Sequence, residues 1–294
     1  MKITKYKAIA TFLILVLISA YFTVLFAHIR ESEKSLSAFS FGNTKDPNHL
    51  EISMEIISMD PIQQTITAHL SFNPQGNLAV SQEDSILSKD IYLYTNVASG
   101  NNKFNFKKND DMPPMNITYS IYDGRIANYP FDNYNAAIYL DVRSLAKDEK
   151  SGTEDLVPVS INLNAAVPGL NIIATKEHSP NQQDVEIFLN VSRSKNTIFY
   201  SLFITAAMWL IAGVLISLLI SVMVLGRSVE VGMLTFSGGM IFTLPALRNV
   251  QPGSPPFGAF SDYLAFFWVQ GIAVMSLVIL AYYFFIISYK NYRS

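Results

Sequence analysis

The side chains that most often carry out catalysis or bind metals are few and scattered in this chain of 294 residues. It contains no cysteine, so it has no disulfide framework, no thiolate metal site and no cysteine nucleophile. Its four histidines lie far apart, and the acidic stretch at residues 148–155 lacks the spacing of an EF-hand loop. An enzyme would have to draw on carboxylates of the expected outer domain, such as those of Asp132 or Asp141. We therefore expect no catalysis, no cofactor and no bound metal.

The first of two motifs that combine rigidity with polar chemistry is Tyr129-Pro130-Phe131-Asp132, which is followed by Tyr134. Proline restricts the backbone angle φ, and aspartate can accept hydrogen bonds from nearby amides. The phenylalanine can either fill the edge of a core or project toward a neighbour. Two interpretations stay open: a corner between two strands, or a coupling loop that presses on membrane helices.

The second motif is a proline-rich stretch at residues 248–262, between two apolar segments. Because proline has no backbone N–H, such a turn can rest at a membrane interface with few unsatisfied donors. Arg248 and Asp262 flank the stretch and are expected to pair across its base. It either caps the two segments or offers a docking surface for the β-rich domain or a partner. Its candidate interaction residues are Arg248, Asn249, Gln251, Pro252, Pro255, Pro256, Phe257 and Asp262.

The elements that must position both motifs follow from the hydrophobic pattern. Half of the residues are hydrophobic and only 15% are charged, which is far from the balance of a soluble protein. Since about 20 apolar residues cross the hydrocarbon layer, each long uncharged run predicts a transmembrane helix, and the third run is marginal in length. The runs without Asp, Glu, Lys or Arg are residues 8–27, 197–226, 231–247 and 263–289.

The first run could be an uncleaved anchor or a signal peptide. It exceeds the roughly 7–15 apolar residues of a signal peptide, and no A-x-A cleavage site follows it. We interpret residues 1–28 as a cytoplasmic tip and a first transmembrane helix. In the third run, Ser237-Gly238-Gly239 and Pro245 are interpreted as helix-packing positions rather than as an interrupted, substrate-binding helix.

The distribution of Lys and Arg predicts the orientation of these helices. Outside residues 28–196 there are seven basic residues, and only Arg248 lies opposite to the side of the N-terminus. We expect both termini in the cytoplasm of a bacterial inner (plasma) membrane and residues 28–196 outside it. That outer segment contains 21 acidic and 14 basic residues, which argues against nucleic acid as a partner.

Between the first and second runs the hydrophobic period changes to two. Residues 29–49 are polar and mixed, and are interpreted as a stalk. From Leu50 to Ile56 and from Ile66 to Phe72, apolar and polar residues alternate as in half-buried strands. The Asp123-Gly124 pair predicts a two-residue hairpin turn. Seven further strands are expected at residues 91–95, 103–106, 117–122, 136–142, 157–163, 170–174 and 185–191.

These patterns predict the fold class and its domains. We expect a membrane α-helical bundle of four transmembrane helices, one N-terminal and three C-terminal. An extracytoplasmic antiparallel β-sandwich is expected at residues 50–195, since short strands separated by turn residues are typical of that fold. Residues 196–294 then form a three-helix transmembrane region, which contains the proline-rich outer loop.

Two resemblances rest on the motifs. Together, the Tyr129–Tyr134 motif in a β-rich domain and the stretch from Leu244 to Pro256 resemble the family called domain of unknown function 4436. That resemblance would cover nearly the whole chain, and it implies a membrane protein without an assigned activity. Pro130-Phe131-Asp132 alone resembles a loop of pentameric ligand-gated channels. Those channels, however, have four spans after the β-sandwich, and three are expected here.

Two classes of function are compatible with these expectations. The first is binding or assembly, in which the β-sandwich or the proline-rich loop engages another envelope protein or a membrane lipid, or associates with itself. The alternative is a channel or transporter subunit formed by oligomerisation. Such a pore would need polar positions such as Ser201, Thr205 and Ser217, and these do not share one clean helical face.

Overall fold

The computed structural model describes residues 19, 22, 38–42, 46–80, 86–145, 154–176 and 185–293. The predicted first transmembrane helix and most of the predicted stalk therefore lie outside the described residues. The chain divides into two compact units. The β domain comprises the chain up to Gly124 together with Asn133–Asn196, and the helical unit comprises Arg125–Asp132 together with Thr197–Ser294.

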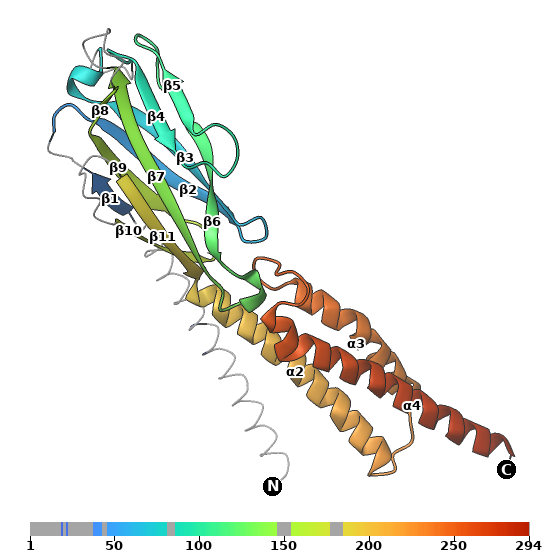
Figure 1. Cartoon of the computed structure of the whole chain (residues 1–294). Helices are drawn as coiled ribbons and strands as arrows, with labels where there is room; N and C mark the ends of the chain where they lie inside the picture. The colour runs from blue at the N-terminus through green and yellow to red at the C-terminus, as the bar shows by residue number, and fades with distance from the viewer. Residues whose placement is uncertain are drawn as a thin grey trace. The chain divides into compact units, whose positions relative to one another are not determined.

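The β domain is a large mixed sheet of eleven strands (Figure 1). Its strands are β1 (Ala38–Gly42), β2 (Leu50–Asp60), β3 (Thr65–Pro74), β4 (Ile91–Thr95), β5 (Lys103–Phe106), β6 (Met115–Gly124), β7 (Asn133–Leu145), β8 (Glu154–Leu156), β9 (Val159–Ala165), β10 (Leu170–Lys176) and β11 (Val185–Arg193). The strand order is β1-β9-β2-β3-β6-β7-β11-β10; off this path β4 and β8 pair with β7, and β5 pairs with β4.

Strand β6 belongs to both halves of this sheet. Its residues 115–120 pair with β3, and its last residues pair with β7 after a register shift between Ile121 and Asp123. Such an irregularity bends a strand, and the sheet can thereby fold back on itself. Phe72 on β3 and Phe106 on β5 then meet from the two halves, with ring centroids 5.7 Å apart.

The interior of the β domain follows from strict alternation along the strands. Leu50, Ile52, Met54 and Ile56 of β2 are buried, and the residues between them are not. The same alternation continues in β3, β6, β7 and β11. Each strand thus has one apolar face, and these faces together form the core.

Three details of the sequence-based prediction are wrong. The sheet is not wholly antiparallel, because β2 and β9 run parallel. Residues 38–42 of the predicted stalk form β1, which pairs with β9, and a Cβ at Gly42 would collide with the Val159 carbonyl. The predicted two-residue hairpin at Asp123-Gly124 is instead an eight-residue connection, Arg125–Asp132, because the chain makes a 3-10 turn before it returns as β7.

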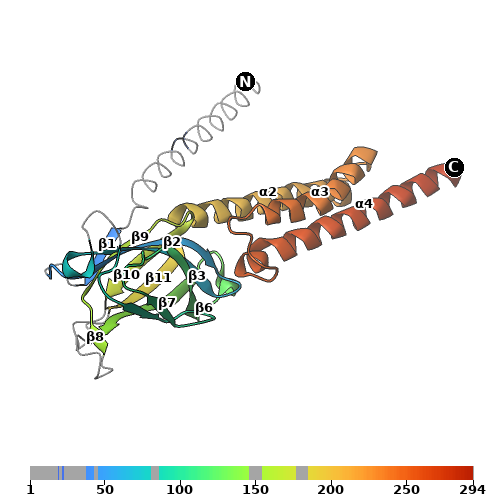
Figure 2. The ribbon, with the colours of Figure 1, turned by 90° about the horizontal axis from the view of Figure 1, so that it is seen from above.

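The helical unit contains three helices that are long and apolar enough to cross a membrane. They are α2 (Lys195–Met223), α3 (Val231–Asn249) and α4 (Phe267–Arg293), and α4 continues from a π-helical turn, η3 (Asp262–Phe266) (Figure 2). The predicted runs at residues 197–226, 231–247 and 263–289 correspond to these helices. Pro245 and the Ser237-Gly238-Gly239 stretch do not interrupt α3.

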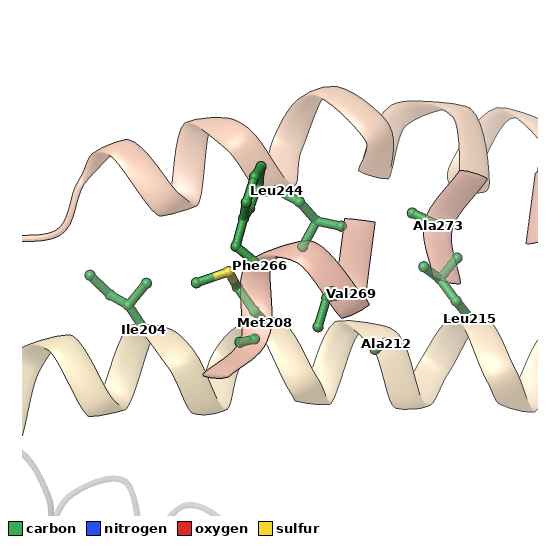
Figure 3. Packing of buried hydrophobic residues seen from close by; sticks show 9 residues of the cluster. Ile204, Met208, Ala212, Leu215, Leu244, Phe266, Val269 and Ala273 are labelled. Carbon is green, nitrogen blue, oxygen red and sulfur yellow. The ribbon is translucent and has the colours of Figure 1, made fainter. Parts of the chain in front are cut away.

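The three helices pack through buried residues that recur at steps of three and four along each helix, the spacing of one helical face. The cluster shown in Figure 3 joins α2, α3 and the η3–α4 segment. Its members are Ile204, Met208, Ala212, Leu215, Leu244, Ala265, Phe266, Val269 and Ala273.

Side chains also satisfy backbone groups that the helices leave open. Because Pro245 has no N–H, the carbonyl of Ile241 loses its partner one turn along α3, and Gln270 Nε2 of α4 donates to it at 3.1 Å. At η3 the indole of Trp209 on α2 donates to the carbonyl of Leu264 at 3.0 Å. Both bonds join two helices, so they fix the helices in register.

Candidate functional site

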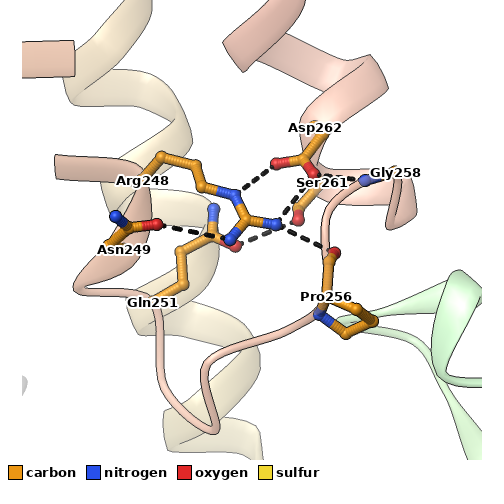
Figure 4. A network of polar contacts seen from close by, with 7 residues as sticks. All are labelled: Arg248, Asn249, Gln251, Pro256, Gly258, Ser261 and Asp262. Atoms are coloured by element: carbon orange, nitrogen blue, oxygen red, sulfur yellow. Dashed lines mark hydrogen bonds and ion pairs between the residues drawn. The ribbon is translucent and has the colours of Figure 1, made fainter. Parts of the chain in front are cut away.

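The candidate site of the helical unit is built around the turn between α3 and α4, residues 250–261, which we call the α3–α4 turn. The guanidinium of Arg248 and the carboxylate of Asp262 pair at its base (Figure 4). Arg248 Nε donates to Oδ1 and Nη2 donates to Oδ2, both at 2.8 Å. The two side chains are only 6% and 0% exposed. The predicted ion pair across the loop base is therefore confirmed, and it is bidentate and buried.

The remaining hydrogen-bonding capacity of this pair is used by the turn itself. Arg248 Nη2 also donates to the carbonyl of Pro256 at 2.9 Å, and the backbone N–H of Gly258 donates to Asp262 Oδ2 at 2.8 Å. Arg248 lies in the last turn of α3, and Asp262 lies in the first turn of η3. A cation at a helix C-terminus and an anion at an N-terminus both complement the helix dipole.

A second set of bonds links the turn to the segment between β6 and β7, residues 125–132, which we call the β6–β7 loop. Ser261 Oγ donates to Gln251 Oε1 at 3.0 Å, and both side chains are buried. The backbone N–H of Ser261 donates to the carbonyl of Tyr129 at 3.1 Å. One residue therefore connects the β6–β7 loop with the buried polar network of the α3–α4 turn.

Aromatic contacts occur at the ion pair and between the α3–α4 turn and the β6–β7 loop. The guanidinium carbon of Arg248 lies 4.8 Å from the ring centroid of Phe257, which itself meets Phe266 edge to face at 5.5 Å. Phe131 of the β6–β7 loop meets Phe260 of the turn edge to face at 6.3 Å. Stacking on an arginine and edge-to-face packing both stabilise, the first by about 0.5–2 kcal/mol.

The structure separates the sequence-predicted residues into groups. The whole Tyr129–Asp132 stretch belongs to the helical unit: Tyr129, Pro130 and Asp132 are buried, and Phe131 is exposed. Tyr134 does not join it, because it is a buried residue of β7 in the β domain. The segment is a corner between two strands, β6 and β7, as one interpretation predicted, and Tyr129 and Phe131 also contact Ser261 and Phe260 of the α3–α4 turn. That it acts as a coupling loop on membrane helices stays a prediction.

The residues of the proline-rich stretch also differ from one another. Gln251 and Pro255 are buried, and Pro252 and Pro256 are half-buried. Asn249 is exposed, and its side-chain oxygen lies 3.4 Å from Arg248 Nη1. The stretch is thus a folded turn with an inner and an outer face.

Sequence reasoning missed Ser261 and Phe260, and it did not predict the bond of Trp209 to the Leu264 carbonyl. Ser261 precedes Asp262, so its burial could have been suspected, but its bond to Tyr129 joins positions 132 residues apart. Phe260 and Trp209 lie in or beside hydrophobic stretches of the sequence. A hydrophobic pattern indicates that such a residue is apolar, but it does not identify the residues that it contacts.

Polar chemistry outside this region is sparse among the described residues. Asp141 of the β domain is buried, and one of its oxygens, Oδ2, accepts from both Nε and Nη2 of Arg143 at 2.8 Å. The imidazole of His69 lies on the polar face of β3, with Nδ1 2.7 Å from Asn116 Oδ1. Within the ranges that the structure describes, no group of three or more His, Cys, Asp or Glu side chains could hold a metal ion.

The fold and the site define a class: a mixed β-sheet domain joined to three helices that could span a membrane, with a buried ion pair in the turn between two of them. The chain belongs to the family described as Domain of unknown function (DUF4436), whose model matches residues 40–189. A second model, Domain of unknown function (DUF8686), matches residues 193–287. No curated protein matches the chain.

The boundary between the two matches corrects one expectation. The stretch from Leu244 to Pro256 falls in the second model, so the resemblance to the first family does not extend over nearly the whole chain. The β6–β7 loop falls in the first model and the α3–α4 turn in the second. The contacts of Tyr129 and Phe131 with this turn therefore join residues from two family models.

Proposed function

We propose that this protein is a multi-pass membrane protein that binds or assembles another component of the cell envelope, a protein or a lipid, without catalysis. In this proposal residues 8–27 form a fourth span, and both termini are in the cytoplasm of a bacterial inner membrane. The β domain lies outside and carries the binding surface. The three candidate spans after the domain, together with the distribution of Lys and Arg in the sequence, support this orientation.

The observation that carries the proposal is that the chain enters the helical unit twice. It enters at α2, which begins two residues after β11 ends, and it enters at the β6–β7 loop, which is hydrogen-bonded to Ser261. A flexible tether would need one attachment only. Two attachments, one of them onto a turn braced by a buried ion pair, support a role in which the β domain and the helical unit act together.

A channel formed by oligomerisation has less support. Of the polar positions that such a pore would need, Thr205 and Ser217 donate their hydroxyls to carbonyls of their own helix, those of Ser201 and Gly213. Hydroxyls bonded in this way contribute little polarity to a water-filled path.

The experiment is extraction of the full chain from membranes into native lipid discs, followed by native mass spectrometry of everything that is retained. The proposal expects a discrete second protein or lipid that is lost when the β6–β7 loop is released by Arg248→Met. The matched control is Arg227→Met, which removes an exposed arginine. A ring of identical subunits without any other component would favour the channel instead.

A further inference from the structure

The exposed ring of Phe131 is the least expected apolar group of the β6–β7 loop. Its neighbours Tyr129, Pro130 and Asp132 are buried, whereas Phe131 is 54% exposed. Exposing half of a phenylalanine ring to water forfeits much of the favourable free energy of burying it. The surroundings of this ring therefore need an explanation.

The contact with Phe260 indicates how deep Phe131 lies. Phe260 is two residues before the candidate span that begins at Asp262, a distance of about 3 Å along a helix axis. Phe131, which touches this ring, is therefore at the end of a membrane-spanning segment. In a bilayer, that level is the boundary between the hydrocarbon and the headgroups.

Other aromatic residues at this level are exposed in the same way. Phe257, Phe260 and Tyr263 lie in the turn and in the first turn of the span, and their rings are largely uncovered. Tyrosine and tryptophan, which join an apolar ring to a polar group, are enriched at this depth, and a phenylalanine beside them can bury its wholly apolar ring at the acyl boundary. The exposed surface of Phe131 thus continues a surface that already faces lipid in the proposed membrane placement.

We propose that Phe131 is a lipid anchor, by which the β6–β7 loop inserts an aromatic ring into the headgroup boundary of the bilayer. The partner is the bilayer lipid rather than a protein, since the ring lies beside a span end and extends its aromatic surface. The inference rests on the proposed membrane placement of the helices. It adds that a connection between two strands of the β domain is itself a membrane-contacting element.

The absence of native cysteine provides a clean test. In the full chain in lipid discs, a nitroxide label is placed at Phe131→Cys and at three reference positions. Leu210 of α2 is 74% exposed and serves for the hydrocarbon, and Tyr263, 61% exposed, serves for the span end. Val80, 59% exposed beyond the end of β3, serves for water. Collision rates are measured with oxygen, which partitions into lipid, and with a water-soluble nickel chelate.

At position 131 we expect a ratio of oxygen to nickel collisions equal to that at Tyr263, or between the ratios at Tyr263 and Leu210. This ratio should be several times the ratio at Val80. A ratio equal to that of Val80, with Leu210 still lipid-like, overturns the anchor but not the membrane placement. A water-like ratio at Leu210 overturns the placement and the anchor with it. Low collision with both reagents at position 131 means that a protein surface covers the ring, which also overturns the anchor.

A second variant keeps an aromatic ring at this position in case the label disturbs the loop. In Phe131→Trp, the added tryptophan fluorescence should be quenched by lipids brominated in their acyl chains. The reference is the parent chain, whose Trp209 and Trp268 report the native background. Added fluorescence that such lipids leave unquenched would contradict the anchor.

Discussion

The two units of this protein treat buried polar groups differently. In the β domain such groups are dispersed: Asp141 relies on the half-exposed Arg143, and one carboxylate oxygen takes both bonds. In the helical unit the buried pair of Arg248 and Asp262 belongs to a network at the α3–α4 turn, where both oxygens of Asp262 are bonded. Substituting one buried polar group of the sheet should therefore disturb only its immediate neighbours. Substituting one at the turn should disturb the helices, the turn and the β6–β7 loop together.

The largest effect is expected for Arg248→Met. It leaves the carboxylate of Asp262 buried without its cation, and breaking a buried pair from one side costs about 3–5 kcal/mol of unfolding free energy. Thermal unfolding in lipid discs measures the loss. Arg248→Lys should restore little of it, because an ammonium cannot form the bidentate bonds.

The same change at Arg143 sharpens the comparison. Arg143→Met also strands a buried carboxylate, but the Arg143 side chain is 40% exposed and water screens the pair. We expect a clearly smaller loss of unfolding free energy than at Arg248. An equal loss would mean that the gathered network at the turn adds no stability over a single pair.

Tyr119 tests the dispersed polar groups of the β domain by pH. Burial raises the pKa of this phenol to about 12, against a smaller lowering by its hydrogen bond with Thr95. Since the unfolded chain releases this proton near pH 10, the contribution of the protonated phenol to the free energy of unfolding is fully present below that pH. It then falls by about 2–3 kcal/mol as the pH rises to about 12.

Unfolding of the parent and of Tyr119→Phe at alkaline pH measures this contribution of Tyr119 to the free energy of unfolding. The variant should lose less stability between these pH values. The exposed neighbour on the same strand is the matched control, because Tyr122→Phe should leave the loss unchanged. Identical pH slopes for the parent and Tyr119→Phe would contradict the prediction.

A smaller effect is expected at the bond between Gln270 and the Ile241 carbonyl. Gln270→Leu removes the donor that replaces the missing N–H of Pro245, at a cost of about 0.5–2 kcal/mol. In a Pro245→Ala background the helix supplies its own donor, so the same change should cost much less. A double-mutant cycle of thermal unfolding measures this difference. If the effects of Gln270→Leu and Pro245→Ala simply add, Gln270 does not replace the missing N–H of Pro245.

The smallest effect is expected for Arg227→Met. The pair between Arg227 and Glu230 lies within the connection from α2 to α3, with its atoms 3.2 Å apart, and its side chains are 58% and 62% exposed. Exposed pairs contribute little, so the thermal stability should change by less than about 0.5 kcal/mol. A loss of stability as large as that of Arg248→Met would mean that the exposed pair between α2 and α3 stabilises as much as the buried pair between α3 and η3.

Local patterns predicted the local parts of this structure well. The strands at Ile91–Thr95 and Lys103–Phe106 have the predicted bounds, and α2, α3 and α4 follow from uncharged runs. The parallel pairing of β2 with β9 was missed because alternation is the same for either direction of a neighbour. The short strand β1 was missed because two phenylalanines within a polar stretch give too brief a period.

The candidate site was predictable to the same extent. Arg248 and Asp262 flank one turn, so their pairing could be read from their positions. The bond from Ser261 to Tyr129 and the contact of Phe131 with Phe260 depend on how the chain folds over long distances. No period or motif encodes such contacts, and only three-dimensional structure reveals them.

The central claim is that the braced α3–α4 turn holds the β6–β7 loop, and cross-linking in membranes tests it most directly. The cysteine-free chain allows Phe131→Cys and Phe260→Cys to be combined and treated with a short bifunctional thiol reagent. The account predicts efficient cross-linking in the native background and a marked loss when Arg248→Met is added, but no loss with Arg227→Met. Absence of cross-linking in the native background, or equal yields in all three, would contradict it.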